Sequence, residues 1–202
     1  MTDRKIRMIL ASGSPRRREL MEQAGLQCEI ITSRIQEKTV KSRPEDIVMD
    51  LSRQKAEAVY SKLPIVDADA PYYVVIGADT IVSCDGTILG KPRDRGDEIS
   101  MLHLLQGRSH HVFTGVSILS ETECSVFYCD TEVFLTPMTD REIEMYADTS
   151  EPYDKAGGYA IQGRFGVFVS GIRGDYNNVV GLPVSRLYHE LMKMGLLDPQ
   201  FT

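Results

Sequence analysis

The cysteines of the chain lack the paired spacing of a metal or redox site. None of the four cysteines belongs to a CxxC pair. Cys28 and Cys84 stand alone, and Cys124 and Cys129 are placed too irregularly for a zinc site. We therefore expect free thiols in a reducing cytosol.

Long apolar runs and an excess of positive charge are also missing. No segment approaches the roughly 20 apolar residues of a membrane helix, and residues 1–12 contain no apolar stretch long enough for a signal peptide. The net charge of -6 argues against nucleic-acid binding by the chain as a whole. These absences predict a cytoplasmic protein with neither a nucleic-acid nor a membrane partner.

What is present is typical of a globular protein. The 202 residues, 42% hydrophobic and 26% charged, have room for one domain or for two small lobes that share a core. Helical and β-rich segments alternate without an internal repeat, which predicts an α/β fold with a mixed twisted sheet and flanking helices. The expected strands are 7–11, 28–33, 72–89, 110–120, 124–138 and 167–172. Within 72–89 we expect a break at 77–80 and a hairpin turn at 85–86. The expected helices are 15–25, 44–63, 93–107, 139–150 and 183–197.

The segment SGSPRR, residues 12–17, joins the first expected strand to the first expected helix. Ser14 suits the N-cap, Pro15 the first helical position and Gly25 the stop. Yet residues 16–18 are all arginine, at the end of the helix dipole where acidic residues are preferred.

A bound polyanion would offset this repulsion. Backbone N–H groups at a helix start form an anion site, and Arg16 and Arg17 add donors suited to phosphate oxygens. The alternative is a solvated turn whose arginines pair with acids elsewhere. We expect Arg18 to be a plain surface residue.

Two further stretches suggest a site. Asp79 in GADT follows an apolar strand, where a carboxylate holds a divalent metal, takes a proton from water, or merely caps a turn. Lys91 in GKP stands on a rigid turn that does not match a P-loop, and it either approaches a phosphate or is a surface lysine.

The stretch EPYDKAGGYAIQG, residues 151–163, has the composition of a site loop or of a flexible surface loop. Gln162 offers a donor and an acceptor to a base edge. His110 and His111 are consecutive on a strand and point to opposite faces, so we expect no shared metal there.

Eight features, in this order along the chain, together resemble the Maf family of nucleotide pyrophosphatases and span almost the whole chain. They are LASGSPRR, Glu37, RQKA, GADTIV, GKP, the histidine-led strand motif, EPYDKAGGYAIQG and NNVVGLP. The IQG form is similar to the branch that acts on dTTP and UTP. The resemblance implies a single Maf-like domain over residues 1–202, two-lobed like inosine-triphosphate pyrophosphatases, with a cleft between the lobes. It also implies a homodimer, and cleavage of a nucleoside triphosphate between the α and β phosphorus to give a monophosphate and pyrophosphate.

The resemblance also implies roles for single residues. Asp79 and Glu37 would be the metal carboxylates, for Mg2+ or alternatively Mn2+ or Co2+, and Asp79 acts either as the base or as a ligand only. The catalytic candidates are Asp79, Glu37, Lys55 and Lys91. The phosphates would be held by Ser12, Arg16, Lys55 and Lys91, with Arg17 as a supporting cation. Substrate choice would rest on Arg16, Thr80 and Gln162.

Other functions share these residues. A regulatory protein that binds pyrimidine triphosphates without turnover needs the cations but no metal site with a free base. A house-cleaning enzyme for modified uridine nucleotides uses the same chemistry and differs only in the pocket.

Overall fold

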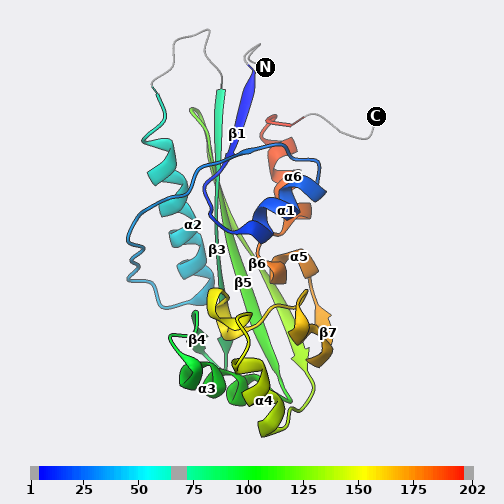
Figure 1. Cartoon of the computed structure of the whole chain (residues 1–202). Helices are drawn as coiled ribbons and strands as arrows, with labels where there is room; N and C mark the ends of the chain where they lie inside the picture. The colour runs from blue at the N-terminus through cyan, green and yellow to red at the C-terminus, as the bar shows by residue number, and fades with distance from the viewer. Residues whose placement is uncertain (1–4, 65–71, 198–202) are drawn as a thin grey trace. The chain divides into compact units, whose positions relative to one another are not determined.

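The computed structural model describes residues 5–64 and 72–197 (Figure 1). The chain divides into two compact units. The first contains the described residues up to Asp79, Thr114–Tyr128 and those from Gly181 onward, and the second contains Thr80–Phe113 and Cys129–Val180. This division agrees with the two lobes expected from the sequence.

A seven-stranded sheet has the order β2-β1-β3-β5-β6-β7, and β4 pairs with β3. The strands are β1 Ile6–Leu10, β2 Glu29–Ile30, β3 Tyr72–Cys84, β4 Thr87–Leu89, β5 Ser109–Leu119, β6 Cys124–Leu135 and β7 Val169–Arg173. Strand β1 pairs in parallel with β2 and β3, whereas β3 with β4 and β6 with β7 are antiparallel. The prediction of an α/β fold with a mixed sheet is confirmed.

Most helices lie between strands in the sequence, and the last two follow β7. The helices are α1 Pro15–Gln23, α2 Pro44–Tyr60, α3 Arg95–Leu105, α4 Asp140–Ala147, α5 Tyr176–Val180 and α6 Val184–Lys193, with 3-10 turns η1 Pro152–Asp154, η2 Ala156–Gly158 and η3 Arg164–Phe168. No helix among the described residues is long and apolar enough to cross a membrane.

In the first unit, the backbone of α2 touches the sheet directly. A Cβ on Gly77 of β3 would lie 2.1 Å from the Ser52 carbonyl oxygen, and one on Gly115 of β5 would lie 2.3 Å from the backbone of Val48. The hydroxyl oxygens of Ser52 and Ser117 are hydrogen-bonded at 2.8 Å. Glycine at these two positions therefore sets the short distance between α2 and the strands β3 and β5. In Figure 1, α2 runs alongside the sheet.

In the second unit, aromatic rings form the centre of the core. Phe165 is fully buried, and its ring centroid lies 4.8 Å from that of Tyr159 and 5.0 Å from that of Tyr146. Leu102 of α3 and Ile143 of α4 are buried in the same cluster. The segment around residues 159–165 is thus part of a packed core and not a loose loop.

Several local predictions are confirmed. Asp85 and Gly86 have φ of 48° and 78° and turn β3 into β4. Thr139 and Glu142 form a capping box at the start of α4. Ser14 is the N-cap residue of α1, although its side chain makes no capping hydrogen bond.

Other predictions are wrong. The break expected at 77–80 does not exist, because β3 runs continuously from Tyr72 to Cys84. The small residues at 77–80 are typical of a turn, but pairing with neighbouring elements keeps their backbone extended. The strand expected at 28–33 shortens to Glu29–Ile30. The strand expected at 167–172 begins only at Val169, because η3 occupies the residues before it.

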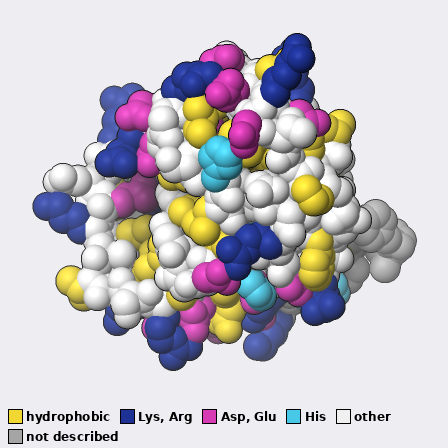
Figure 2. Space-filling view, turned by 90° about the horizontal axis from the view of Figure 1, so that it is seen from below, with side chains coloured by type: hydrophobic (Ala, Val, Ile, Leu, Met, Phe, Trp, Pro, Cys, Tyr) yellow, Lys and Arg dark blue, Asp and Glu magenta, His cyan; other side chains and the backbone are white. Residues whose placement is uncertain are grey.

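Charges of both signs are interspersed on the face of the molecule drawn in Figure 2. Among the ion pairs of the second unit, Arg93 Nη2 lies 2.9 Å from Asp97 Oδ1, and Arg95 Nε lies 2.6 Å from Asp148 Oδ1. Such exposed pairs contribute little to stability.

Candidate active site

The three arginines at the start of α1 have different surroundings. The Arg17 side chain reaches inward, where Nε donates to the Gly181 carbonyl at 2.8 Å and Nη1 donates to the Ala78 carbonyl at 2.8 Å and to Ser12 Oγ at 3.2 Å. Arg18 is exposed, 3.7 Å from Glu22. Arg16 is half-buried in the first turn of α1.

These contacts make Arg17 part of the framework. Burial lowers the pKa of Arg17, and the charge of Asp79 opposes that shift. Its guanidinium bonds hold the turn after β1 against β3, and the supporting phosphate contact that the resemblance implies for Arg17 stays a prediction. Arg18 is the surface residue that the sequence predicted.

Ser12 lies at the centre of this turn. It is 6% exposed, and its hydroxyl oxygen accepts from the Ser14 N–H at 3.2 Å as well as from Arg17. The preceding Ala11 N–H donates to the Ile76 carbonyl of β3 at 2.7 Å. The turn is therefore fastened directly beside the residues that lead to Asp79.

Lys55 joins the two predicted carboxylates. Its Nζ lies 2.5 Å from Asp79 Oδ1 and 3.0 Å from Glu37 Oε2. The side chains of Lys55 and Asp79 are 11% and 12% exposed, whereas Glu37 is 39% exposed. Residues far apart in the sequence thus meet as one charged cluster on the first unit.

The close contact of α2 with β3 explains this meeting. Ser52 and Ala56, on either side of Lys55 along α2, are the residues whose atoms approach Gly77. Asp79 follows Gly77 on the same strand, so fixing Gly77 against α2 also brings Asp79 to Lys55.

Asp79 does not stand at the end of a strand, as the sequence suggested. It lies inside β3, between the residues 72–76 that pair with β1 and the residues 82–84 that pair with β4. Of the two expected strand ends, only the one before Ser12 exists, because β1 ends at Leu10. β3 continues past this end of β1, and Asp79 lies in that continuation.

The donor set of the cluster fits a metal that is shared with a substrate. The described residues contain no group of three or more His, Cys, Asp or Glu side chains that could hold a metal ion. Asp79 and Glu37 both reach one ammonium and are therefore close to each other. Two carboxylates are sufficient for Mg2+, which keeps several waters and takes further oxygens from substrate phosphates.

Three other predicted site residues belong to the second unit. Thr80 follows Asp79 on β3 and is half-buried. Lys91 is exposed on the turn after β4, and the Gly90 carbonyl in that turn accepts from the Gly157 N–H at 2.9 Å. Gln162 is exposed in the turn between η2 and η3.

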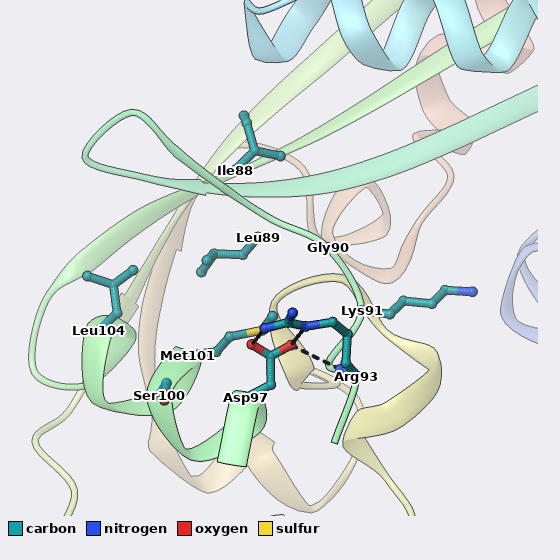
Figure 3. Close-up of a pocket in the computed structure, with 9 residues that line it drawn as sticks. All are labelled: Ile88, Leu89, Gly90, Lys91, Arg93, Asp97, Ser100, Met101 and Leu104. Atoms are coloured by element: carbon teal, nitrogen blue, oxygen red, sulfur yellow. Dashed lines mark hydrogen bonds and ion pairs between the residues drawn. The ribbon is translucent and has the colours of Figure 1, made fainter. Parts of the chain in front are cut away.

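A cavity of about 400 Å³ lies beside the turn that carries Lys91 (Figure 3). Its lining residues are Ile88, Leu89, Gly90, Lys91, Arg93, Asp97, Ser100, Met101 and Leu104. In Figure 3 the Lys91 side chain extends away from the others, while Arg93 and Asp97 pair with each other. The Lys91 ammonium is therefore directed away from this cavity.

The sequence interpretation missed two kinds of residue. Gly77 and Gly115 position α2, and only their small size in a β-rich context hinted at a close approach. Glu151, within the EPYDKAG stretch, accepts from the N–H groups of Arg164 at 3.0 Å and of Phe165 at 3.3 Å. Glu98 is fully buried, and no pattern in the sequence indicated this.

Comparison with known proteins identifies the family of the chain. The family model described as "Maf-like protein" matches residues 7–194, a range that contains every predicted site residue. The chain belongs to the Maf family. The dTTP/UTP pyrophosphatase of Bacillus thuringiensis subsp. konkukian is 48% identical over 94% of this chain and 96% of its own length. The dTTP/UTP pyrophosphatase of Agathobacter rectalis is 45% identical over 94% of this chain and 98% of its own length.

The Staphylococcus aureus Ham1 protein is a solved structure that aligns with 94% of this Maf-family chain and 100% of its own. The TM-score is 0.47 and the sequence identity is 13%. So distant a likeness says nothing about activity.

Proposed function

We propose that the chain hydrolyses dTTP and UTP between the α and β phosphorus, releasing a nucleoside monophosphate and pyrophosphate, within one domain made of both units. The observation that carries the proposal is the meeting of Lys55 with Asp79 and Glu37 beside the start of α1. The Maf relatives named dTTP/UTP pyrophosphatase are similar over nearly the whole chain, which supports the substrate class.

Electrostatics supports a triphosphate. A triphosphate carries about four negative charges near neutral pH, and phosphoryl transfer is catalysed mainly by positioning and charge stabilisation. Arg16 and the backbone of the turn around Ser12 offer donors at a helix start. Lys55 adds an ammonium in the same unit, and we assign a phosphate contact to Lys91.

We assign the metal to Asp79 and Glu37. A bound Mg2+ would neutralise phosphate charge and lower the pKa of a bound water. Asp79 is an acceptor for a water proton or serves only as a ligand, and Lys55 orients its carboxylate in either case. Arg16, Thr80 and Gln162 are assigned to substrate choice. A homodimer and a cytoplasmic location, expected from the sequence, stay predictions.

Pyrophosphate release tests this function. The protein is incubated with each canonical nucleoside triphosphate and with modified uridine triphosphates, with Mg2+ and with EDTA. We expect pyrophosphate and monophosphate in equal amounts from dTTP and UTP, and a loss of turnover in EDTA that excess Mg2+ restores.

Other products would contradict the proposal in distinct ways. Release of single phosphate would show that a different bond is cleaved. Binding without turnover would identify a regulatory nucleotide-binding protein. Faster turnover of modified uridine nucleotides than of UTP would make those the substrates.

A further inference from the structure

The turn that presents Gln162 is short, and Gln162 and Gly163 are exposed although Ala160 before them is buried. The Gly163 N–H donates to the Ala160 carbonyl at 3.0 Å, which places Ile161 and Gln162 at the corner. An exposed turn of this length does not fix a side-chain amide by itself, because ordering it costs conformational entropy. Accurate recognition of a base requires that the backbone on both sides be held.

A buried hydrogen bond holds the side before the turn. Tyr159 is 6% exposed, and its hydroxyl oxygen lies 2.6 Å from His110 Nε2 on β5. The two rings meet edge to face, with centroids 5.3 Å apart. Burial lowers the pKa of His110 to about 4, so the imidazole is neutral at neutral pH and the bond joins two uncharged groups.

A carboxylate holds the side after the turn. Glu151 accepts from the N–H groups of Arg164 and Phe165 and, at 3.0 Å, from the Tyr146 hydroxyl. Burial alone would raise the pKa of Glu151, but these hydrogen bonds outweigh it and lower the pKa. A Cβ on Gly163 would lie 2.4 Å from Glu151 Oε1, so the carboxylate fills the space beside the turn.

The two sides are also joined to each other. The ring centroids of Tyr159 and Phe165 are 4.8 Å apart, and Phe165 is fully buried. The segment that contains Gln162 therefore begins and ends on adjacent rings in the core of the second unit.

We propose that Glu151 and the His110–Tyr159 pair are positioning residues that fix the 160–163 turn and thereby the Gln162 amide that selects the base. This inference rests on the proposed function, because it takes Gln162 as a reader of the nucleotide. The positioning residues act through Gln162 and do not touch the reacting phosphates.

Removing the Tyr159 hydroxyl is the sharpest test. Tyr159→Phe keeps the ring contacts and deletes only the bond to His110. The measured quantity is the ratio of kcat/KM for UTP to that for GTP. We expect this ratio to fall about fivefold to tenfold, through KM, with kcat for UTP within twofold of the wild type.

A matched control is Tyr153→Phe. The Tyr153 hydroxyl donates to the Ala147 carbonyl at 2.6 Å in the same unit, so this bond joins η1 to the end of α4. We expect its loss to leave the UTP-to-GTP ratio unchanged.

Glu151→Gln tests the other side of the turn. One carboxylate oxygen becomes an NH2 donor, which faces a backbone N–H or the Tyr146 hydroxyl. We expect the ratio to fall at least as far as in Tyr159→Phe. The control is Glu142→Gln, because the Glu142 carboxylate likewise accepts a backbone N–H, that of Thr139 at 2.8 Å.

A double-mutant cycle decides the outcome. If the positioning residues act through Gln162, Tyr159→Phe has no further effect on the ratio in a Gln162→Ala background. Additive losses, or an equal drop in kcat for every nucleotide, would overturn the inference while UTP turnover leaves the proposed function standing. An unchanged ratio in Gln162→Ala alone would also overturn it, whereas absence of pyrophosphate release by the wild type would overturn the proposed function itself.

Discussion

Acidic side chains are buried in both units, and their partners differ. In the first unit, Asp79 is buried and its carboxylate meets the Lys55 ammonium at 2.5 Å. In the second unit, Glu98 is fully buried, and neither of its oxygens has a hydrogen-bond partner among the described residues.

The difference shows two ways to keep a carboxyl group inside a protein. Asp79 lies beside the Lys55 ammonium, which also contacts the half-exposed Glu37. Burial raises the pKa of Glu98 to about 8, with the nearby charge of Asp97 adding to the shift, so this acid is largely protonated at neutral pH. The first arrangement is suited to chemistry and the second to packing.

The largest effect is expected from removing the charge of Asp79. Asp79→Asn keeps the shape but can neither accept a proton nor provide an anionic metal ligand, so turnover should fall about a thousandfold or more. Pyrophosphate release measures this loss, and the thermal unfolding midpoint shows whether the fold persists. Asp85→Asn in the turn after β3 is the control, since asparagine also tolerates its positive φ. Full activity of Asp79→Asn would remove this residue from the mechanism.

The second-largest loss of turnover is expected when Lys55 and Asp79 are moved apart without a change in their charges. In Gly77→Ala the added Cβ meets the Ser52 carbonyl at 2.1 Å, so α2 must move and carry Lys55 away from Asp79. We expect a loss of at least about 2 kcal/mol of stability by urea unfolding, together with a loss of turnover. Gly171→Ala on β7, where nothing lies within 4 Å of an added Cβ, is the control. Normal turnover in Gly77→Ala would show that the Lys55–Asp79 contact is dispensable.

The smallest effect concerns Glu98 and depends on pH. Because its pKa is raised in the folded state, the unfolded chain releases this proton first as the pH increases. The folded state therefore loses stability relative to the unfolded chain as the pH rises from about 4.5 to about 8.

Glu98→Gln removes this titration. We expect the wild type to lose stability relative to Glu98→Gln as the pH rises from 5 to 8, measured by urea unfolding at each pH. Glu144→Gln, on the exposed face of α4, is the control and should leave the pH dependence unchanged. Parallel stability curves for the wild type and Glu98→Gln would show that Glu98 is ionised or solvated in the folded protein.

The sequence predicted most of the elements and the order in which they occur. Local signals were sufficient for the Thr139 capping box and the Asp85–Gly86 turn, because both depend on neighbouring residues. The continuity of β3 through Gly77 could not be read in the same way. Its residues 72–76 pair with β1, which is distant in the sequence, whereas its residues 82–84 pair with β4, which follows directly.

The site shows the same limit. No periodicity links Glu37, Lys55 and Asp79, and only the resemblance to the Maf family grouped them. The burial of Glu98 had no signal, since an acidic residue in the first turn of a helix is ordinarily exposed. The inward direction of Arg17 depends on a carbonyl 164 positions away.

That last contact has a consequence for chain connectivity. Arg17 ties its own turn to Ala78 and to Gly181, and so closes two large loops of the polypeptide at one guanidinium. The entropy of closing a loop increases only slowly with its length, so the longer closure costs little more than the shorter one. In a chain whose four cysteines are all free, one guanidinium thus holds three distant segments together through hydrogen bonds, which reducing agents do not affect.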